Sequence, residues 1–402
     1  MLVHFMLVHS FSTYRLLVLF GCFFILFPFV GISQEKESLY KPLISAEKME
    51  FLDNIYMSMN MRMGFRSYIF RGGDHDYQGN QFVNEYTALN IRAKVHEKVR
   101  INFRNRFNKT ANVQSLDQLG NNIELAYMEV DFTPRLQVKF GRQYAFFGGY
   151  EYSFSGMDVM EYNDIQNNAL VYVTGVGLEY EVSSTQSFGF QVLNSRTMHY
   201  QDKYGDDVAD NIQEPDWPVE VVGRWVGQFF DGKLETRYSY SYSREVKDKG
   251  TQYITLGHRY KNNKLSIMHD FAYSYEQVDT KGVATEIIGD GNIAQKVMYI
   301  ENWIRTEYEF NPRFTGLLTL MTNNTFGKYF NNTSGDKKQL RRSYGVIPTV
   351  YYRPFEDINL RFFLTYILRY YDYTNFSKQE FGATSYNRNE IRLGIIAPLR
   401  FL

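Results

Sequence analysis

The sequence predicts an all-β fold, a transmembrane antiparallel β-barrel of about 16 strands, on the strength of three observations. Apolar and polar residues alternate along many segments, aromatic residues are abundant, and the connections between segments alternate between long and short. Alternation with a period of two places one kind of side chain on each face of a strand. A membrane barrel needs this pattern, because one face of each strand meets lipid and the other meets water.

The alternation of side chains is clear in Ile91–Asn108 and in Glu390–Phe401. In the second segment, for example, the apolar residues Ile391 and Leu393 flank Arg392. A helix would place the apolar residues of such a segment all round its axis, so the pattern favours strands.

The composition agrees with a barrel and excludes several other classes of protein. The chain has 33 Tyr and 33 Phe, yet its mean hydropathy is only −0.39. Aromatic residues are typical of the two interfaces of a membrane barrel, whose water-facing residues keep the hydropathy low. The 44 basic and 44 acidic residues balance, which argues against a nucleic-acid partner. Cys22 is the only cysteine and lies in the expected signal peptide, so we expect no disulfide, thiolate catalysis or thiolate metal site in the mature chain. We also expect no cofactor.

The N-terminus predicts export from the cytoplasm. A basic residue precedes the apolar run Leu16–Val30, and the small residues of Gly31-Ile32-Ser33 follow it. This order is typical of a signal peptide, which we place at residues 1–33. A short periplasmic segment, 34–54, and the barrel, 55–402, then follow. The alternative is that the apolar run is retained as a membrane-spanning helix.

The connections between the expected strands alternate between long and short, as in bacterial outer-membrane barrels with short turns on one rim and longer loops on the other. The exception is Lys247–Gly250, a short connection where a long one is due. A soluble β-sandwich is the alternative fold, but it rarely needs 16 strands of membrane-spanning length. The expected long connections are Gly72–Gln81, Thr110–Gly120, Gly148–Asn167, Tyr200–Asp216, Asp279–Ala294, Thr325–Gln339 and Thr374–Ser385.

Four stretches carry a resemblance to a known family: Phe140–Tyr152, Met157–Ile165, Val192–Arg196 and Gly227–Gly232. They resemble the Bacteroidetes outer-membrane porins grouped with the phosphate-selective porin O and P family, and the resemblance covers most of the chain after Ile55. It implies a trimeric porin of 16 strands in the bacterial outer membrane, with the third extracellular loop folded into the lumen.

Sorting the strands by face gathers basic residues on the side expected to face the lumen. Because closing a barrel makes the last strand the neighbour of the first, five adjacent strands contribute to one basic wall. Charges on the lipid face are costly, so these side chains are expected to point inward. The predicted wall consists of Arg62, Arg66, Arg92, Lys94, Arg100, Arg104, Arg106, Arg361, Arg369, Arg388 and Arg392.

Acidic residues gather in the third long connection, Gly148–Asn167. No Lys or Arg occurs between Gln143 and Ser195. If this loop folds inward, its carboxylates would face the basic wall across the narrowest aperture, where charge sets the selectivity for ions. The alternative is that the charges form ordinary interior ion pairs, such as Arg62 with Glu390. The acidic residues of the loop are Glu151, Asp158, Glu161 and Asp164.

These features predict a porin that lets ions and small hydrophilic solutes diffuse passively through a water-filled pore, with lipid and solutes as its partners. Which sign of ion it prefers is left open. A substrate-specific channel for phosphate or another anion, a sugar or a peptide is the alternative. In it, Tyr152, Phe154 and Tyr162 would form a stacking surface, although they could equally pack the loop against the wall. A barrel enzyme using Asp74-His75-Asp76 is a further alternative, but such a sequence is typical of a solvated turn.

Overall fold

The computed structural model describes residues 54–73, 77–110, 116–204, 212–289, 291, 293–328 and 337–400. All of them belong to one compact unit, Glu47–Leu402. The expected signal peptide, the segment 34–54 apart from Asn54, and Asp74-His75-Asp76 lie outside the described residues.

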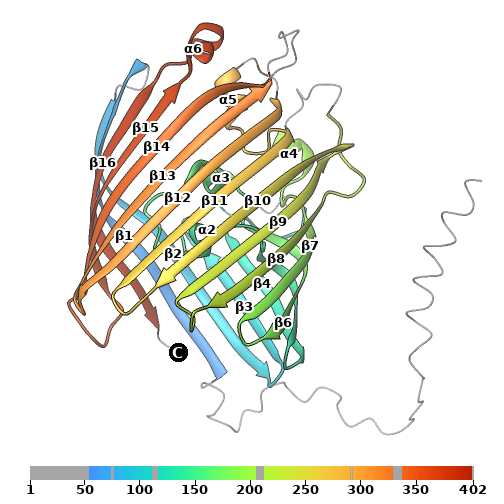
Figure 1. The fold of residues 1–402 in the computed structure, drawn as a ribbon. Coiled ribbons are helices and arrows are strands. Elements are labelled where there is room, and N and C mark those ends of the chain that lie inside the picture. The colour runs from blue at the N-terminus through green and yellow to red at the C-terminus, as the bar shows by residue number, and fades with distance from the viewer. Residues whose placement is uncertain are drawn as a thin grey trace, which may run out of the picture. The chain divides into compact units, whose positions relative to one another are not determined.

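Sixteen antiparallel strands in this part of the chain form one closed barrel, as the sequence predicts (Figure 1). Each strand pairs with its neighbours in sequence, and β16 pairs with β1 to close the ring. Closure leaves no strand edge unpaired, which a membrane requires of a sheet. The strands are β1 (Ile55–Arg71), β2 (Tyr77–His96), β3 (Val99–Arg106), β4 (Ile123–Thr133), β5 (Leu136–Tyr144), β6 (Tyr172–Ser183), β7 (Gln186–Asn194), β8 (Val219–Phe229), β9 (Leu234–Val246), β10 (Lys249–Lys261), β11 (Leu265–Val278), β12 (Gln295–Asn311), β13 (Phe314–Lys328), β14 (Lys338–Tyr352), β15 (Arg361–Tyr373) and β16 (Tyr386–Arg400).

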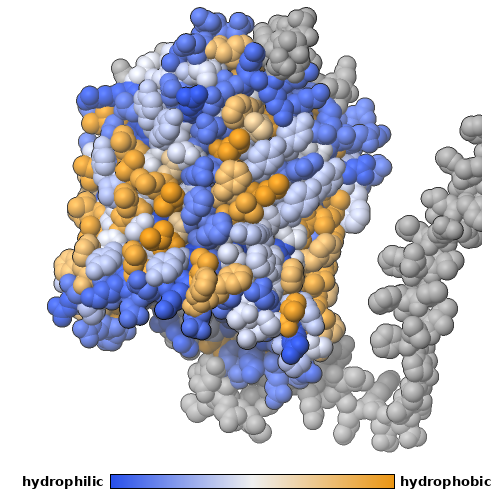
Figure 2. All heavy atoms as spheres, in the orientation of Figure 1, coloured by the Kyte–Doolittle hydropathy of each residue, from blue (hydrophilic) through white to orange (hydrophobic). Residues whose placement is uncertain are grey.

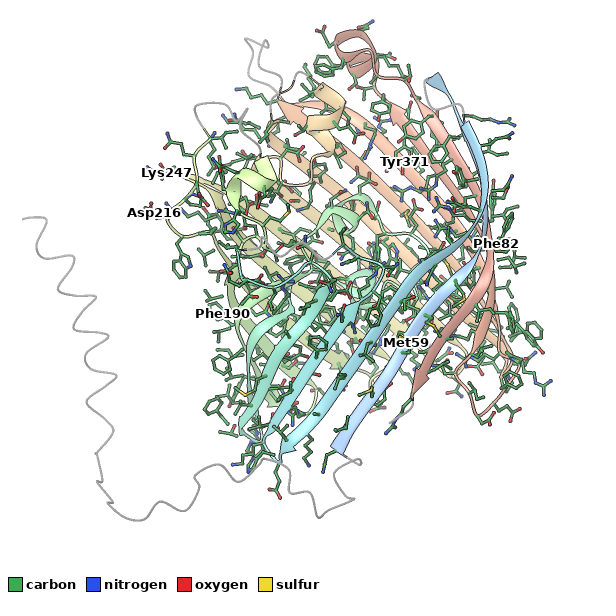
Figure 3. The ribbon with its side chains drawn as sticks, turned by 180° about the vertical axis from the view of Figure 1, so that it is seen from behind. Met59, Phe82, Phe190, Asp216, Lys247 and Tyr371 are labelled. Carbon is green, nitrogen blue, oxygen red and sulfur yellow. The ribbon has the colours of Figure 1, made fainter. Side chains whose placement is uncertain are left out.

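The two faces of the wall differ in chemistry. On β14, Ser343 and Thr349 are buried on the inner face, whereas Tyr344 and Val350 are exposed on the outer face. Figure 2 shows the apolar outer side chains in orange between bluer regions at the two ends of the barrel. Phe82, labelled in Figure 3, is 86% exposed on this surface. The outer face is therefore suited to lipid and the inner face to water.

Short turns and longer connections lie at opposite ends of the barrel. Three helices, α4 (Tyr200–Tyr204), α5 (Val283–Ile288) and α6 (Asn375–Phe381), belong to the longer connections at one end (Figure 1). The predicted short connection between β9 and β10 is confirmed, since β9 ends at Val246 and β10 begins at Lys249.

The predicted connection Gly72–Gln81 begins correctly after Arg71, but its predicted end at Gln81 is wrong. Strand β2 begins at Tyr77, and Gln81 lies opposite Arg66 in the ladder between β1 and β2. The polar side chains of this stretch suggested a loop, but backbone hydrogen bonds extend the strand regardless of side-chain polarity.

The third long connection, residues 145–171, carries α2 (Tyr150–Ser153) and α3 (Asp164–Asn168). Helix α2 contacts β10 and β11, and α3 contacts β12; both lie behind the near wall in Figure 1. Among the described residues, no helix is long and apolar enough to cross a membrane.

Two glycines allow this connection to leave β5 and approach the opposite wall. Gly148 has a φ of 92°, a conformation that residues with a Cβ rarely adopt. A Cβ at Gly149 would lie 2.1 Å from a carboxylate oxygen of Asp270 on β11. A buried apolar cluster then joins Met157 and Met160 of the connection to wall residues such as Trp303.

Candidate functional site

The predicted basic wall forms a continuous surface, because β15, β16, β1, β2 and β3 are consecutive neighbours in the barrel. Residues directly opposite each other in antiparallel strands share a face. Arg369 lies opposite Arg388, and Arg392 lies opposite Arg66. The outer neighbours of these arginines, such as Ile391, are exposed. All eleven predicted basic residues lie on the inner face by the same test.

Three acidic residues of the third connection bind arginines of this wall directly. Arg361 lies 2.7 Å from Asp158, and Arg388 forms an ion pair with Glu161. These contacts involve strands β15 and β16 and hold the middle of the connection against the wall.

Asp164 forms the most deeply buried of these contacts. Its carboxylate lies 2.9 Å from Arg369, whose side chain is only 1% exposed. Arg341 on β14 pairs with the same carboxylate. Both guanidinium groups lie over the ring of Tyr371, which is labelled in Figure 3, at 5.3 and 5.1 Å. Charge and aromatic contact together fix this end of the connection.

Backbone oxygens of the connection accept hydrogen bonds from two further wall arginines. Arg62 donates to the carbonyl oxygen of Val159 at 2.6 Å, and Arg392 donates to that of Met160 at 2.9 Å. The buried Arg62 also lies 2.6 Å from Glu85 on β2. The wall therefore binds the connection through its backbone as well as its carboxylates.

The arrangement differs from the expectation that the acids face the basic wall across an aperture. Asp158, Glu161 and Asp164 touch the arginines instead. The physical reason is that a carboxylate partly removed from water is stabilised by a direct, charge-assisted hydrogen bond. The expected ion pair of Arg62 with Glu390 is not formed. Arg62 pairs with Glu85 instead, and Glu390 lies 2.7 Å from Arg392.

Glu151 was expected to face the basic wall, but it lies near other acidic residues instead. Its backbone N–H donates to Asp270 on β11 at 2.7 Å, and its carboxylate accepts from the backbone N–H of Asn163 at 2.6 Å. On the same side, Glu301 of β12 accepts from the backbone N–H of Ile165 at 2.6 Å. Burial, reinforced by the charge of Glu301, raises the pKa of Glu151 well above its usual range.

The part of the wall on β2 and β3 is not bound to the third connection. Arg100 pairs with Glu129 and with Asp131, and these carboxylates neutralise its positive charge. Arg92 is exposed and donates to the uncharged Asn102 at 2.9 Å. Lys94 is exposed and has no ion pair or hydrogen bond within the described part of the chain.

Arg104 and Arg106 share a single acid, Glu124 on β4, at 3.8 and 3.6 Å. Arg66 lies 3.9 Å from Glu390, which already pairs with Arg392. The wall therefore divides into a part neutralised by the third connection and a part that keeps an excess of positive charge.

Several residues that contact the third connection or its arginines were not identified from the sequence. Arg341 alternates in phase with Ser343 on β14 and could have been found, but the predicted wall was confined to the five strands from β15 to β3. Arg305 also faces inward and donates to the carbonyl oxygen of Asp158 at 3.3 Å. The buried Glu85 and Glu301 carried no signal, because a single acid within a strand does not reveal its partner.

The aromatic residues of the third connection pack against one another and, through Phe154, against the wall. Tyr152 is 8% exposed and contacts Phe147 with ring centroids 5.2 Å apart. Phe154 contacts Trp303 at 6.3 Å, and Tyr162 donates to the carbonyl oxygen of Phe154 at 3.1 Å. Packing, the second of the two interpretations, explains these contacts.

The histidines described offer no inward-facing catalytic pair. His258 and His269 lie opposite each other on β10 and β11, with parallel rings 6.1 Å apart. Both alternate with inner-face residues such as Asp270, so they belong to the outer face. No group of three or more acidic, histidine or cysteine side chains suited to a metal occurs among the residues described.

The comparisons with known proteins agree with this architecture. A family model described as phosphate-selective porin O and P matches residues 57–394. The outer membrane channel DcaP of Acinetobacter baumannii has a similar structure, with a TM-score of 0.59 and 14% identity over 86% of this chain and 97% of that one. OprB of Pseudomonas putida matches with a TM-score of 0.54 and 11% identity over 88% of this chain and 96% of that one.

Salmonella typhi OmpF, solved in complex with daunomycin, matches with a TM-score of 0.52 and 14% identity over 87% of this chain and 99% of that one. At sequence identities of 11–14%, the structural similarity shows that these proteins share the fold. The comparison with curated proteins found no match.

Proposed function

Because the chain belongs to the phosphate-selective porin O and P family, we propose that it is a passive diffusion channel of the bacterial outer membrane. The observation that carries the proposal is a closed barrel of 16 strands with an apolar outer face and a charged inner face. Such a channel needs neither a catalytic group nor a cofactor, because solutes follow their own concentration gradients. The Bacteroidetes origin implied by the resemblance is part of the proposal.

The third connection is the proposed constriction of the pore. The support is its contact with inner-face residues: Asp158, Glu161 and Asp164 bind wall arginines, and Glu301 binds the backbone N–H of Ile165. The proposal is supported by the path of the connection, which leaves β5, contacts β11, β12, β15 and β16, and returns to β6; a segment on such a path would narrow the interior.

The proposed selectivity is for anions and depends on the part of the wall that the third connection does not neutralise. Arg92 and Lys94 are exposed on the inner face without a carboxylate partner among the residues described. A lumen lined by charge of one sign concentrates ions of the other sign. Arg361 and Arg388 contribute less, because carboxylates of the connection cancel their charges.

A homotrimer is also proposed. The outer face where β1 meets β16 carries exposed apolar side chains, including Met63, Ile391 and Leu393, and this is the surface that would meet another copy. Chemical cross-linking in native membranes should give a covalently linked trimer. Detection of the monomer alone contradicts the proposed assembly.

Reconstitution into planar bilayers and sugar-loaded liposomes tests the channel and its constriction together. The protein should conduct ions and admit small sugars while excluding larger ones. The triple variant D158N/E161Q/D164N, which frees the connection from its arginines, should conduct more and admit larger sugars. A barrel that does not conduct contradicts the channel, and an unchanged size limit in the triple variant contradicts the constriction.

A further inference from the structure

A cavity of about 650 Å³ lies between the third connection and the wall of β2–β6. Tyr162 and Gln166 of the connection line one side of it, and Tyr86, Arg106 and Tyr172 of the wall line the other. Its volume is in the range of sites that hold small molecules. It lies on the side of the connection away from the ion pairs with β15 and β16, where the lumen is not filled by those contacts.

The charge around this cavity is unbalanced. Glu124, which is 1% exposed, lies 2.9 Å from Lys109, 3.6 Å from Arg106 and 3.8 Å from Arg104. Three cations therefore share one carboxylate and leave an excess of two positive charges. Arg142, which also lines the cavity, does not add to this excess, because it is paired with Asp117.

Aromatic rings support Arg106 and Lys109, the two lining cations that share Glu124. The guanidinium of Arg106 lies 4.6 Å from the ring centre of Tyr86, and the ammonium of Lys109 lies 5.5 Å from that of Tyr172. Contact with a ring holds a cation in place. Both side chains keep access to water, at 22% and 36% exposure. Arg106 also donates from Nε to the side chain of Asn108 at 3.0 Å and from Nη2 to the carbonyl oxygen of Glu85 at 3.1 Å, so its Nη1 group is the one that faces a ligand.

The lining also contains apolar surface. Leu170 and Met198 line the cavity together with the faces of Tyr162 and Tyr172. An inorganic anion gains nothing from such surface, and a neutral sugar leaves the excess charge uncompensated. A carboxylate attached to an apolar body uses both features, because it can accept a charge-assisted hydrogen bond from Nη1 of Arg106 and from the ammonium of Lys109 while its body covers the apolar side chains.

We propose that this cavity is a binding site for small organic carboxylates with an aromatic or apolar body, which the channel selects from other anions. The proposal rests on the diffusion function proposed above and names the class of solute that the same lumen favours.

Single-channel recording with benzoate as the probe tests the site. Benzoate should interrupt the current at concentrations about tenfold lower than acetate, inorganic phosphate or the neutral benzamide. Arg106→Gln and Lys109→Gln should each raise the benzoate concentration needed by about tenfold, the usual loss for a hydrogen bond to a charged group. Tyr172→Ala should weaken block by benzoate more than block by acetate.

Arg92→Gln is the matched control, since Arg92 belongs to the same inner wall but not to the cavity. It should weaken block by benzoate and by acetate to the same small extent, because it lowers the positive charge of the lumen but leaves the cavity intact, so the ratio of the two blocking concentrations should stay that of the unaltered protein. Equal block by acetate and benzoate, stronger block by phosphate, or a roughly tenfold loss of benzoate block in Arg92→Gln would overturn the site and leave the channel standing. A barrel without current contradicts the channel. Saturation-transfer NMR of benzoate with the detergent-solubilised protein then still tests the site, and a signal unchanged by Arg106→Gln overturns it.

Discussion

Asp164→Asn should release α3 from the barrel wall. The carboxylate of Asp164 is the shared partner of Arg369 and Arg341, and both guanidinium groups are buried. Asparagine keeps the size of the side chain but removes its charge, so Arg341 loses its carboxylate partner and Arg369 keeps only Glu161, at 3.9 Å. Breaking a buried ion pair by removing one partner costs roughly 3–5 kcal/mol.

The cost should appear in the docking of the third connection, because the barrel strands themselves remain paired. With about 1.4 kcal/mol for each factor of ten, a loss of ~3 kcal/mol raises the undocked population about a hundredfold. Hydrogen–deuterium exchange of the refolded protein measures this directly. The backbone N–H of Ile165, bonded to Glu301, and that of Asn167, bonded to the carbonyl oxygen of Asn163, should exchange about a hundredfold faster.

Two further variants make the result specific. Asp158→Asn is the matched control: its pair with Arg361 is more exposed, at 23% and 14%, so the cost should be about 1 kcal/mol or less. Adding Arg369→Met to Asp164→Asn removes one of the two cations that lose this partner and should slow exchange again. Equal exchange in Asp164→Asn and Asp158→Asn, or no recovery in the double variant, would refute the reasoning.

Three other expected outcomes concern the same connection and its neighbour. Burial and Glu301 raise the pKa of Glu151, so docking of the third connection is strongest with Glu151 protonated and weakens as pH rises through the raised pKa. Glu151→Gln should remove this pH dependence from the open-channel noise. An unchanged noise profile in the variant contradicts the prediction. Arg142 keeps the pKa of Asp117 below its usual range despite partial burial, so their pair stabilises the fold above the ordinary pKa of an aspartate and loses this effect as pH falls through the lowered value. Asp117→Asn should therefore cost about 3 kcal/mol in urea unfolding at pH 7 and less at acid pH, whereas a cost under about 0.5 kcal/mol would oppose this account. Gly149→Ala places a methyl group against a β11 carboxylate and should increase conductance by displacing the connection; an unchanged conductance would show that the backbone adjusts.

The sequence predicts the wall of the barrel well, because face and neighbour follow from simple geometry. A period of two assigns Arg392 to the inner face once Ile391 and Leu393 are assigned to lipid. Barrel closure then places Arg392 beside Arg66, although 325 residues separate them in the chain, and the structure pairs these two positions.

The sequence does not predict which charges meet. The path of the third connection depends on the φ of Gly148, on the close approach at Gly149 and on the packing of Met157 and Met160 against the wall. These are tertiary properties that no local pattern encodes. The sequence places the four acids in one connection, but no local pattern indicates that three of them contact Arg361, Arg369 and Arg388.

Reversal potentials under a salt gradient test the central claim that the β2–β3 part of the basic wall sets the selectivity of an open pore. The unaltered channel should prefer chloride over potassium. Arg92→Gln with Lys94→Gln should move the potential toward cation preference, whereas Arg361→Gln with Asp158→Asn, which removes a neutral pair, should leave it in place. Cation preference in the unaltered channel, or an equal shift in both double variants, would contradict the account.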